Sequence, residues 1–109
     1  MIIKMSVDLS KGFATWKEMV HNNPQKMKEH GFRIIFAGTE ASDDSKLHVI
    51  IEFESPESLE AFQNDAELTQ ARIDAGAVLE SAVATPMSDD SFSNFRKPAA
   101  RCTTSKILG

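Results

Sequence analysis

The sequence predicts an α+β domain in which strands and helices follow one another in the order βαββαβ. Three observations support this fold class. Four stretches alternate apolar and polar residues with a period of two, which is typical of half-buried strands. Two stretches between them carry apolar residues at helical spacing. Proline, glycine and small polar residues stand at the boundaries, where they favour the starts and ends of helices.

The first predicted strand covers residues 3–9, where apolar residues alternate with polar ones. Ser10 is the expected cap of the helical run that follows. Pro24 interrupts this run, which predicts either two abutting helices or one kinked helix. Gly31 is expected to end the run in the left-handed conformation, which favours glycine.

The second predicted strand begins at residue 32. Alternation assigns its residues to two faces, a buried face with Phe32, Ile34 and Phe36 and an opposite face with Arg33, Ile35 and Ala37. The polar segment 38–46, GTEASDDSK, is expected to be the surface loop of a hairpin that leads to the third strand.

The stretch 46–65, KLHVIIEFESPESLEAFQND, is the clearest unit in the chain. Apolar residues alternate from Leu47 to Phe53 and predict the third strand. Ser55 can cap the following helix, and Pro56 suits its first position because the missing N–H has no partner to lose there. The stretch therefore predicts a strand, a sharp turn and a helix.

The last third of the domain contains a further helix and the fourth strand. Asp65 resembles a new cap, and residues 67–74 form a helical piece with Leu68 and Ala71 inward and Ile73 as a third inward candidate. Gly76 ends this piece. Residues 77–85 supply the final strand, with Leu79 and Val83 on one face and Val78, Glu80, Ala82 and Ala84 on the other.

These elements predict a ferredoxin-like fold, because right-handed crossovers give a four-stranded antiparallel sheet with both helical segments on one face. The other face stays open. It would carry many apolar residues, and large exposed apolar patches usually mark an interface. We therefore expect a second copy of the chain to cover it as a homodimer. The residues expected on this face are Ile2, Lys4, Ser6, Arg33, Ile35, Ala37, His48, Ile50, Glu52, Val78, Glu80, Ala82 and Ala84.

Charge divides the 109 residues into two parts. Residues 1–86, the predicted domain, carry 8 basic and 14 acidic side chains, whereas residues 87–109 carry 4 basic and 2 acidic ones. The net charge of −4 argues against a nucleic-acid or membrane partner for the domain, because phosphate binding needs concentrated positive charge. The basic tail is expected to dock through Phe92 and Phe95 onto the body or a partner subunit.

The sequence offers no signature of a cofactor or a metal. The single cysteine, Cys102, cannot form an internal disulfide, and no Cys/His spacing is typical of zinc. Nucleotide loops and nucleophile elbows are also missing from the sequence. Because these motifs are missing, we expect no cofactor. The single cysteine and the lack of a stretch with the length of a signal peptide or a membrane span predict a cytoplasmic protein.

Several segments together resemble the dimeric α+β barrel superfamily, which includes antibiotic-biosynthesis monooxygenase-like and stress-responsive barrel proteins. The segments are FATWKEM, HGFRIIFAG, EFESPESLEAF and AGAV, and the resemblance covers residues 1–86. It implies a homodimer with a pocket between sheet and helices. The enzymes of this superfamily include cofactor-free oxygenases and isomerases. The haem-degrading members use an Asn on the first strand, which this chain lacks, so their roles do not transfer.

Polar residues on the open sheet face are the first candidates for a site. The topology groups Lys4, His48, Glu52 and Glu80, with Arg33 more peripheral. In a functional interpretation His48 accepts a proton and Lys4 or Arg33 binds an anionic oxygen. In the alternative interpretation, which we favour, these groups are ion pairs in the dimer interface. Trp16 is expected in the core or a pocket wall.

The sequence leaves three functions open. The first is a homodimer that binds a small, partly apolar molecule between sheet and helices. The second is a cofactor-independent monooxygenase or isomerase that uses the same pocket, with His48 as the base. The third is a structural or regulatory dimer without a ligand.

Overall fold

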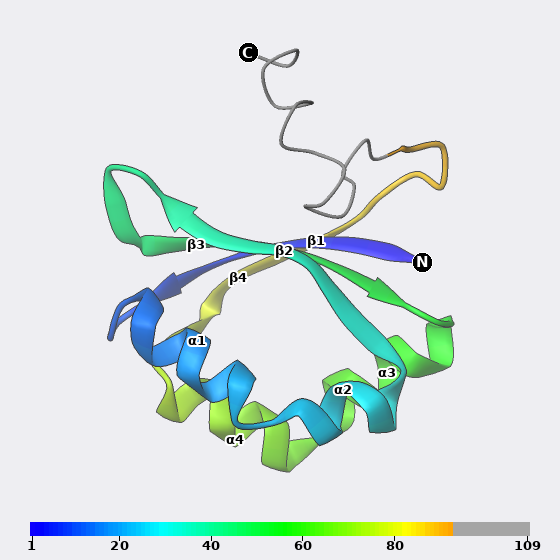
Figure 1. Cartoon of the computed structure of the whole chain (residues 1–109), viewed down its shortest axis with the longest axis horizontal. Helices are drawn as coiled ribbons and strands as arrows, with labels where there is room; N and C mark the ends of the chain where they lie inside the picture. The colour runs from blue at the N-terminus through cyan, green and yellow to red at the C-terminus, as the bar shows by residue number, and fades with distance from the viewer. Residues whose placement is uncertain (93–109) are drawn as a thin grey trace, which may run out of the picture.

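The computed structural model describes residues 1–92 and contains eight elements (Figure 1). The strands are β1 (Ile2–Leu9), β2 (Phe32–Glu40), β3 (Asp43–Phe53) and β4 (Ala77–Pro86). The helices are α1 (Phe13–His21), α2 (Pro24–His30), α3 (Pro56–Asn64) and α4 (Ala66–Asp74). The predicted βαββαβ order is confirmed, and each helical segment consists of two short helices.

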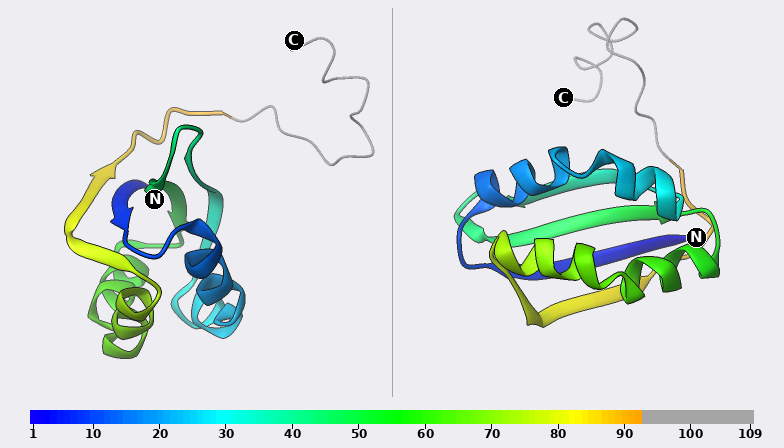
Figure 2. Two further views of the ribbon diagram at one scale, coloured as in Figure 1. Left: turned by 90° about the vertical axis from the view of Figure 1, so that its left-hand side faces the viewer. Right: turned by 90° about the horizontal axis from the view of Figure 1, so that it is seen from below.

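The sheet has the strand order β2-β3-β1-β4, and every neighbouring pair is antiparallel. The helices lie in two rows across one face of the sheet, α1 with α2 and α3 with α4 (Figure 2). The ferredoxin-like plan predicted from the sequence is therefore confirmed. The opposite face of the sheet carries no helix within residues 1–92 (Figure 1).

The central strand β3 supplies much of the core. Leu47, Val49, Ile51 and Phe53 alternate along it and point to the helices, and each is at most 4% exposed. Phe53 forms an aromatic cluster with side chains from β2 and α3, with ring centroids 5.1–5.5 Å apart. This burial holds the helices on the sheet, because removal of apolar surface from water is the main favourable contribution to folding.

The predicted caps of the later helices are confirmed. The Ser55 hydroxyl accepts a hydrogen bond from the backbone N–H of Ser58 at 3.2 Å, at the start of α3. One Asp65 carboxylate oxygen accepts the N–H of Leu68 at 2.9 Å and begins α4. Gly31 ends α2 with a φ of 66°, in the left-handed region as predicted. The side chains of Ser55 and Asp65 thus bond backbone N–H groups at the helix starts that have no partner inside the helix.

The hairpin between β2 and β3 is tighter than the sequence predicts. The expected loop 38–46 is wrong, because β2 continues to Glu40 and β3 begins at Asp43. The polar residues of this segment instead form the end of a long hairpin. One of them, Asp44, reaches α1 and accepts a hydrogen bond from the N–H of Phe13 at 3.0 Å. The polarity of the segment thus reflects an exposed strand end and not a loop.

The cap expected from Ser10 is also wrong. The residue before α1 is Gly12, with a φ of 84° and no capping side chain of its own. Asp44 from the distant hairpin supplies the acceptor, while Ser10 bonds through its N–H and its hydroxyl to the carbonyl of Gly76. A cap supplied by a residue 31 positions away leaves no local sequence signal.

A β-bulge in β2 reverses the predicted faces of its second half. Ile34 pairs with Ile51, but Phe36 pairs with Ile50, so one extra residue, Ile35, interrupts the alternation. Phe36 therefore lies on the open face with 56% of its surface exposed. Ala37 instead packs against the core. The predicted burial of Phe36 and exposure of Ala37 are wrong, because an inserted residue shifts the period of two.

A second irregularity does the same to β4. Ser6 of β1 pairs with Val83 and Asp8 pairs with Val78, so four residues of β4 stand opposite the single residue Val7 of β1. Ser81 fills the gap, since its hydroxyl accepts the N–H of Asp8 at 2.9 Å and donates to the carbonyl of Val78 at 2.6 Å. Val83, predicted on the helix face, pairs with Ser6 and is 58% exposed. Its neighbour Ala84, predicted on the open face, pairs instead with Met5, which packs against the core.

Residues 87–92 leave the sheet after β4, where the N–H of Met87 donates to the carbonyl of Ile2 at 2.9 Å. Of the two residues predicted to dock the tail, Phe92 lies within the described residues. Its side chain is 87% exposed, so it does not dock onto this copy of the chain. Phe95 and Cys102 lie outside the described residues, and so does most of the predicted basic tail. No helix within residues 1–92 is long and apolar enough to cross a membrane.

Candidate functional site

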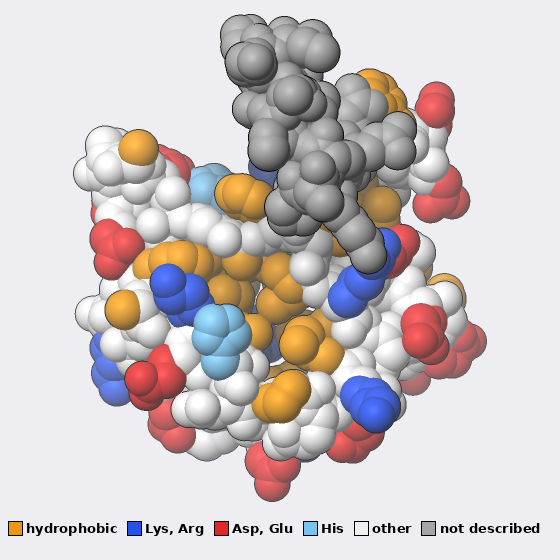
Figure 3. Space-filling view, viewed as in Figure 1, with side chains coloured by type: hydrophobic (Ala, Val, Ile, Leu, Met, Phe, Trp, Pro, Cys, Tyr) orange, Lys and Arg blue, Asp and Glu red, His pale blue; other side chains and the backbone are white. Residues whose placement is uncertain are grey.

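An apolar hollow opens between the sheet and the α1–α2 row. Its outer part, the outer hollow, has a volume of about 430 Å³, and its apolar lining comprises Phe13, Trp16, Val20, Met27, Phe32, Ile34 and Ala37. Figure 3 shows apolar side chains gathered in a depression between the sheet and the helices, with Lys, Arg and His side chains around it. This is a concave apolar surface with polar groups at its edge, the usual form of a small-molecule site.

The inner hollow lies beside the outer one, on the side of α3 and α4. The two share Trp16, Val20, Met27, Phe32 and Ile34, and the inner one has a volume of about 50 Å³. It is bounded on its far side by Ile51, Phe62, Leu68 and Arg72. A space of this size holds a few water-sized groups, because one water needs only about 10–15 Å³.

Local sequence patterns place the lining residues. Trp16 and Val20 are four residues apart and therefore lie on one face of α1. Phe32 and Ile34 precede the bulge in β2 and keep the period of two that points them to the helices. The break at Pro24 starts α2 in a new direction, and Met27 then faces the same space. Trp16 is a pocket wall, one of the two roles predicted for it.

Five basic or titratable side chains line the two hollows, namely Lys17, His21, Lys26, Arg33 and Arg72. The Lys17 ammonium lies 5.1 Å from the centroid of the Phe13 ring, and the Arg72 guanidinium carbon lies 5.1 Å from that of Phe62. Both distances are within the range of cation–π contacts. The electrostatic character of the walls is therefore cationic.

Lys26 belongs to an ion cluster that joins α2 to the α3–α4 junction. Its ammonium lies 2.8 Å from Asp65 and 2.9 Å from Glu67, and Nε2 of His30 lies 2.7 Å from the same Asp65 oxygen. Hydrogen bonds from Lys26, from His30 and from the backbone of Leu68 hold the pKa of Asp65 far below its ordinary value. The bonds to Asp65 and Glu67 raise the pKa of Lys26. We call this group the helix clasp.

The helix clasp also contains a geometric arrangement that resembles a metal site. Glu29, His30 and Asp65 each offer one ligand atom, and these atoms lie within 4.8 Å of one another. One Asp65 oxygen already caps α4, however, and the other already binds Lys26 and His30. A cationic ammonium at this position competes with a metal ion. We therefore assign no metal to these residues.

Within residues 1–92, the polar side chains predicted on the open face lie in different places, because His48 lines a small hollow with Glu40 and Lys46, whereas Arg33 and Glu52 border a groove at the start of β2. His48 Nε2 pairs with Glu40 at 2.8 Å, and Arg33 pairs with Glu52 at 2.6 Å. Within residues 1–92, no hydrogen bond or ion pair joins Lys4, His48 and Glu80 to one another. Glu80 lies in the irregular part of β4, and Lys4 is exposed. Three of the predicted residues, Arg33, Glu52 and His48, form ion pairs within one copy, and their role in a dimer interface stays a prediction.

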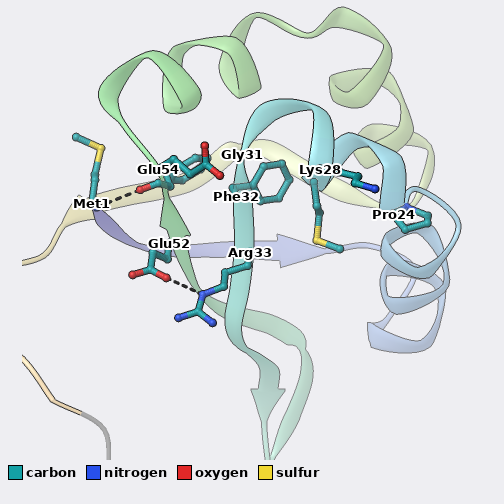
Figure 4. A pocket seen from close by; sticks show the side chains of 10 residues that line it. Met1, Pro24, Lys28, Gly31, Phe32, Arg33, Glu52 and Glu54 are labelled. Atoms are coloured by element: carbon teal, nitrogen blue, oxygen red, sulfur yellow. Dashed lines mark hydrogen bonds and ion pairs between the residues drawn. The ribbon is translucent and has the colours of Figure 1, made fainter.

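A second concavity is a polar groove at the start of β2 (Figure 4). It has a volume of about 750 Å³ and is bounded by Met1, Gly31, Arg33, Glu52 and Glu54. The Met1 amine donates to the carbonyl of Phe53 at 3.1 Å, and the Arg33–Glu52 pair spans the floor. Arg33 and Glu52 satisfy each other and the groove is open to solvent, so it has weaker features of a binding site than the apolar hollow.

The sequence predicts Trp16 and Arg33 as pocket residues but does not identify Lys17, His21, Lys26 and Arg72. A signal for Arg72 exists, since it follows Leu68 by four residues and so lies on the buried face of α4. Arg72 was overlooked because charged residues usually mark the exposed face of a helix. Only the structure shows that the guanidinium reaches the hollow.

Fold and site together define a ferredoxin-like α+β protein with an apolar hollow between its two layers. No family model matches the chain, and no curated protein matches it. Three solved structures share its fold. They are a candidate antibiotic biosynthesis monooxygenase from Nitrosomonas europaea, protein Atu4242 from Agrobacterium tumefaciens and a candidate antibiotic biosynthesis monooxygenase from Deinococcus radiodurans.

The likeness to these structures extends over most of the chain. The Nitrosomonas protein is 13% identical with a TM-score of 0.58, and the alignment covers 84% of this chain. The corresponding values are 16%, 0.61 and 88% for the Agrobacterium protein, and 16%, 0.54 and 89% for the Deinococcus protein. Each is covered over 100% of its length. The chain thus shares the fold of these three structures.

Proposed function

We propose that this protein binds a small, partly apolar molecule in the hollow between sheet and helices. The supporting observation is the apolar wall that the two hollows share, because Trp16, Val20, Met27, Phe32 and Ile34 border both of them, and the outer hollow is open to the surface. Such walls attract apolar ligands because binding removes apolar area from water. The polar groups at the edge would orient the ligand.

The test uses the single tryptophan, Trp16, as a reporter, since it lies in the wall of both hollows. A small apolar quencher such as an acrylate ester should bind saturably and quench Trp16 fluorescence. Val20→Phe narrows the hollow and should weaken saturable quenching at least tenfold. Val83→Phe, which adds the same group on the open face, should leave it unchanged. Equal quenching curves for both variants would contradict the proposal.

An enzymatic use of the same hollow is the alternative function. Two of the structurally similar proteins bear the name of a monooxygenase, and a cofactor-independent oxygenase or isomerase needs a base near its ligand. His48 cannot act inside the hollow, because it lies on the opposite sheet face. His21 lines the outer hollow and is the histidine available there. Loss of turnover in His21→Ala with ligand binding retained would favour this alternative.

We also propose that the protein is a homodimer that joins through the open sheet face. Ile35, Phe36 and Val83 are 47–58% exposed there. The same face carries Arg33 and Glu52, so a two-fold related copy can bring opposite charges together. In sedimentation velocity the wild type should form a dimer, and Phe36→Lys should give a monomer. Glu60→Lys on the exposed side of α3 serves as the control, and a wild-type monomer would contradict the proposal.

A further inference from the structure

The linings of the two hollows depart from the composition of the chain. The sequence has 16 acidic and 12 basic residues, yet the linings contain Lys17, His21, Lys26, Arg33 and Arg72 and not one carboxylate. The walls of both hollows therefore contain cations and no acid, in a protein whose net charge is −4. This asymmetry favours a ligand with negative charge.

Two of these cations are already neutralised. Lys26 pairs with Asp65 and Glu67 in the helix clasp, and Arg33 pairs with Glu52. Among residues 1–92, Lys17 and Arg72 form no ion pair. Lys17 is exposed at the edge of the outer hollow, where water solvates its ammonium. Arg72 lies at the other end of the cavity.

Arg72 is a half-buried cation in apolar surroundings. Its guanidinium lies over the Phe62 ring, and it lines the inner hollow beside Ile51 and Leu68. Burial lowers the pKa of Arg72, the direction expected for a cation removed from water without an anionic partner. Within the described residues the guanidinium makes no hydrogen bond to an oxygen. A ligand oxygen would restore the interactions that burial has removed.

Size and chemistry then fix an orientation for the ligand. The inner hollow, at about 50 Å³, is too small for a ring system but accommodates a planar group of three heavy atoms. The outer hollow, at about 430 Å³, has the space and the apolar wall for a ring or branched chain. A guanidinium binds a carboxylate through two parallel hydrogen bonds, which suits the confined inner end.

We propose that the hollow selects a small organic carboxylate, whose anionic group binds Arg72 in the inner hollow while its apolar body lies in the outer hollow. This inference rests on the proposed function, because it names the ligand class of the same site. The ligand enters past Lys17, whose positive charge attracts anions to the opening. Arg72 is thus the residue that determines specificity, and Trp16 and Phe32 contact the apolar body.

The test compares two probes that differ only in charge, 2-naphthoate and its neutral amide, by isothermal titration calorimetry at pH 7. The wild type should bind the carboxylate roughly ten- to hundredfold more tightly than the amide, the range expected for hydrogen bonds to a charged group. Arg72→Gln should remove that difference and leave amide binding unchanged. Lys46→Gln, which alters a cation of β3 that lines neither hollow, should preserve the preference.

Each outcome separates the two proposals. Equal binding of both probes to the wild type would overturn the carboxylate inference and leave the apolar hollow as the binding site. Binding of neither probe would overturn both. Should Arg72→Gln fail to fold by circular dichroism, Arg72→Lys provides the second variant, since it keeps the charge and loses the two-pronged geometry. Undiminished carboxylate affinity in a folded Arg72 variant would also contradict the inference.

Discussion

The two faces of the sheet are both rich in apolar residues, but they differ in what covers them. On the helix-covered face, Leu47 and Phe53 are each 1% exposed. On the open face, Ile35, Phe36 and Val83 are 47–58% exposed. The two bulges cause part of this difference, because each turns a large apolar residue away from the helices. One face thus stabilises the fold, whereas the other is available for association.

The ion pairs repeat the contrast. In the helix clasp, the side chains of Lys26, His30 and Asp65 are only 10–11% exposed. On the open face, Arg33 and Glu52 are 75% and 39% exposed. Water weakens interactions between exposed charges, so the two pairs should contribute differently to stability. The candidate binding site lies between the sheet and the helices, where Arg72 is partly removed from water. A charge in such a place interacts more strongly with a ligand than an exposed charge does.

The largest effect is expected from Phe53→Ala on the helix-covered face. It removes a side chain that is fully enclosed by the aromatic cluster, and the free energy of unfolding should fall by about 3–5 kcal/mol. Phe36→Ala deletes the same atoms from the open face and should lower the free energy of unfolding of the monomer by less than about 1 kcal/mol. Urea unfolding followed by circular dichroism measures both, and similar losses would show that the two faces are equally buried.

A smaller effect tests the bulge in β2 through two neighbours. Ala37→Lys places a charge against the core and should destabilise the fold by roughly 1–3 kcal/mol. Phe36→Lys places it on the open face and should change stability by no more than about 0.5 kcal/mol. The measurement is made at a protein concentration where both variants are monomeric. The reverse order of stabilities would restore the simple alternation that the sequence predicts.

The helix clasp should make stability depend on pH on the acid side. The pKa of Asp65 is depressed in the folded protein, so its contribution is complete above the ordinary value of 3.8 and is lost as the pH falls below it. Asp65→Asn should therefore flatten the loss of melting temperature between about pH 5 and pH 2. Glu60→Gln, an exposed carboxylate on α3, serves as the control. Parallel acid limbs for Asp65→Asn and the wild type would refute the assignment.

The smallest effect is expected at the exposed pair on the open face. Arg33→Gln breaks the 2.6 Å contact with Glu52 but should lower the free energy of unfolding of the monomer by less than about 1 kcal/mol. The loss should shrink further in 0.5 M salt, because screening weakens exposed ion pairs. Guanidinium is unsuitable for this comparison, as it is itself a salt, so urea is the denaturant. A loss that exceeds that of Ala37→Lys would reverse the ranking.

The sequence by itself determined the order of the elements, the ferredoxin-like topology and the caps at Ser55, Asp65 and Gly31. These features depend on short-range patterns, such as periodicity and the chemistry of helix ends, that are written in neighbouring residues. It also identified Trp16 as a residue of a buried face. The same reasoning could find a strand but could not find the residue at which its alternation breaks.

The tertiary structure alone decided which side chains meet. The bulges at Ile35 and around Ser81 depend on pairing between distant strands, and the cap from Asp44 comes from a hairpin far along the chain. His48, predicted to belong to a polar group on the open face, instead pairs with Glu40. Arg72 of α4 lines the inner hollow, although charged residues usually lie on the exposed face of a helix. Long-range contacts form between residues without a shared local pattern, so one sequence alone does not reveal them.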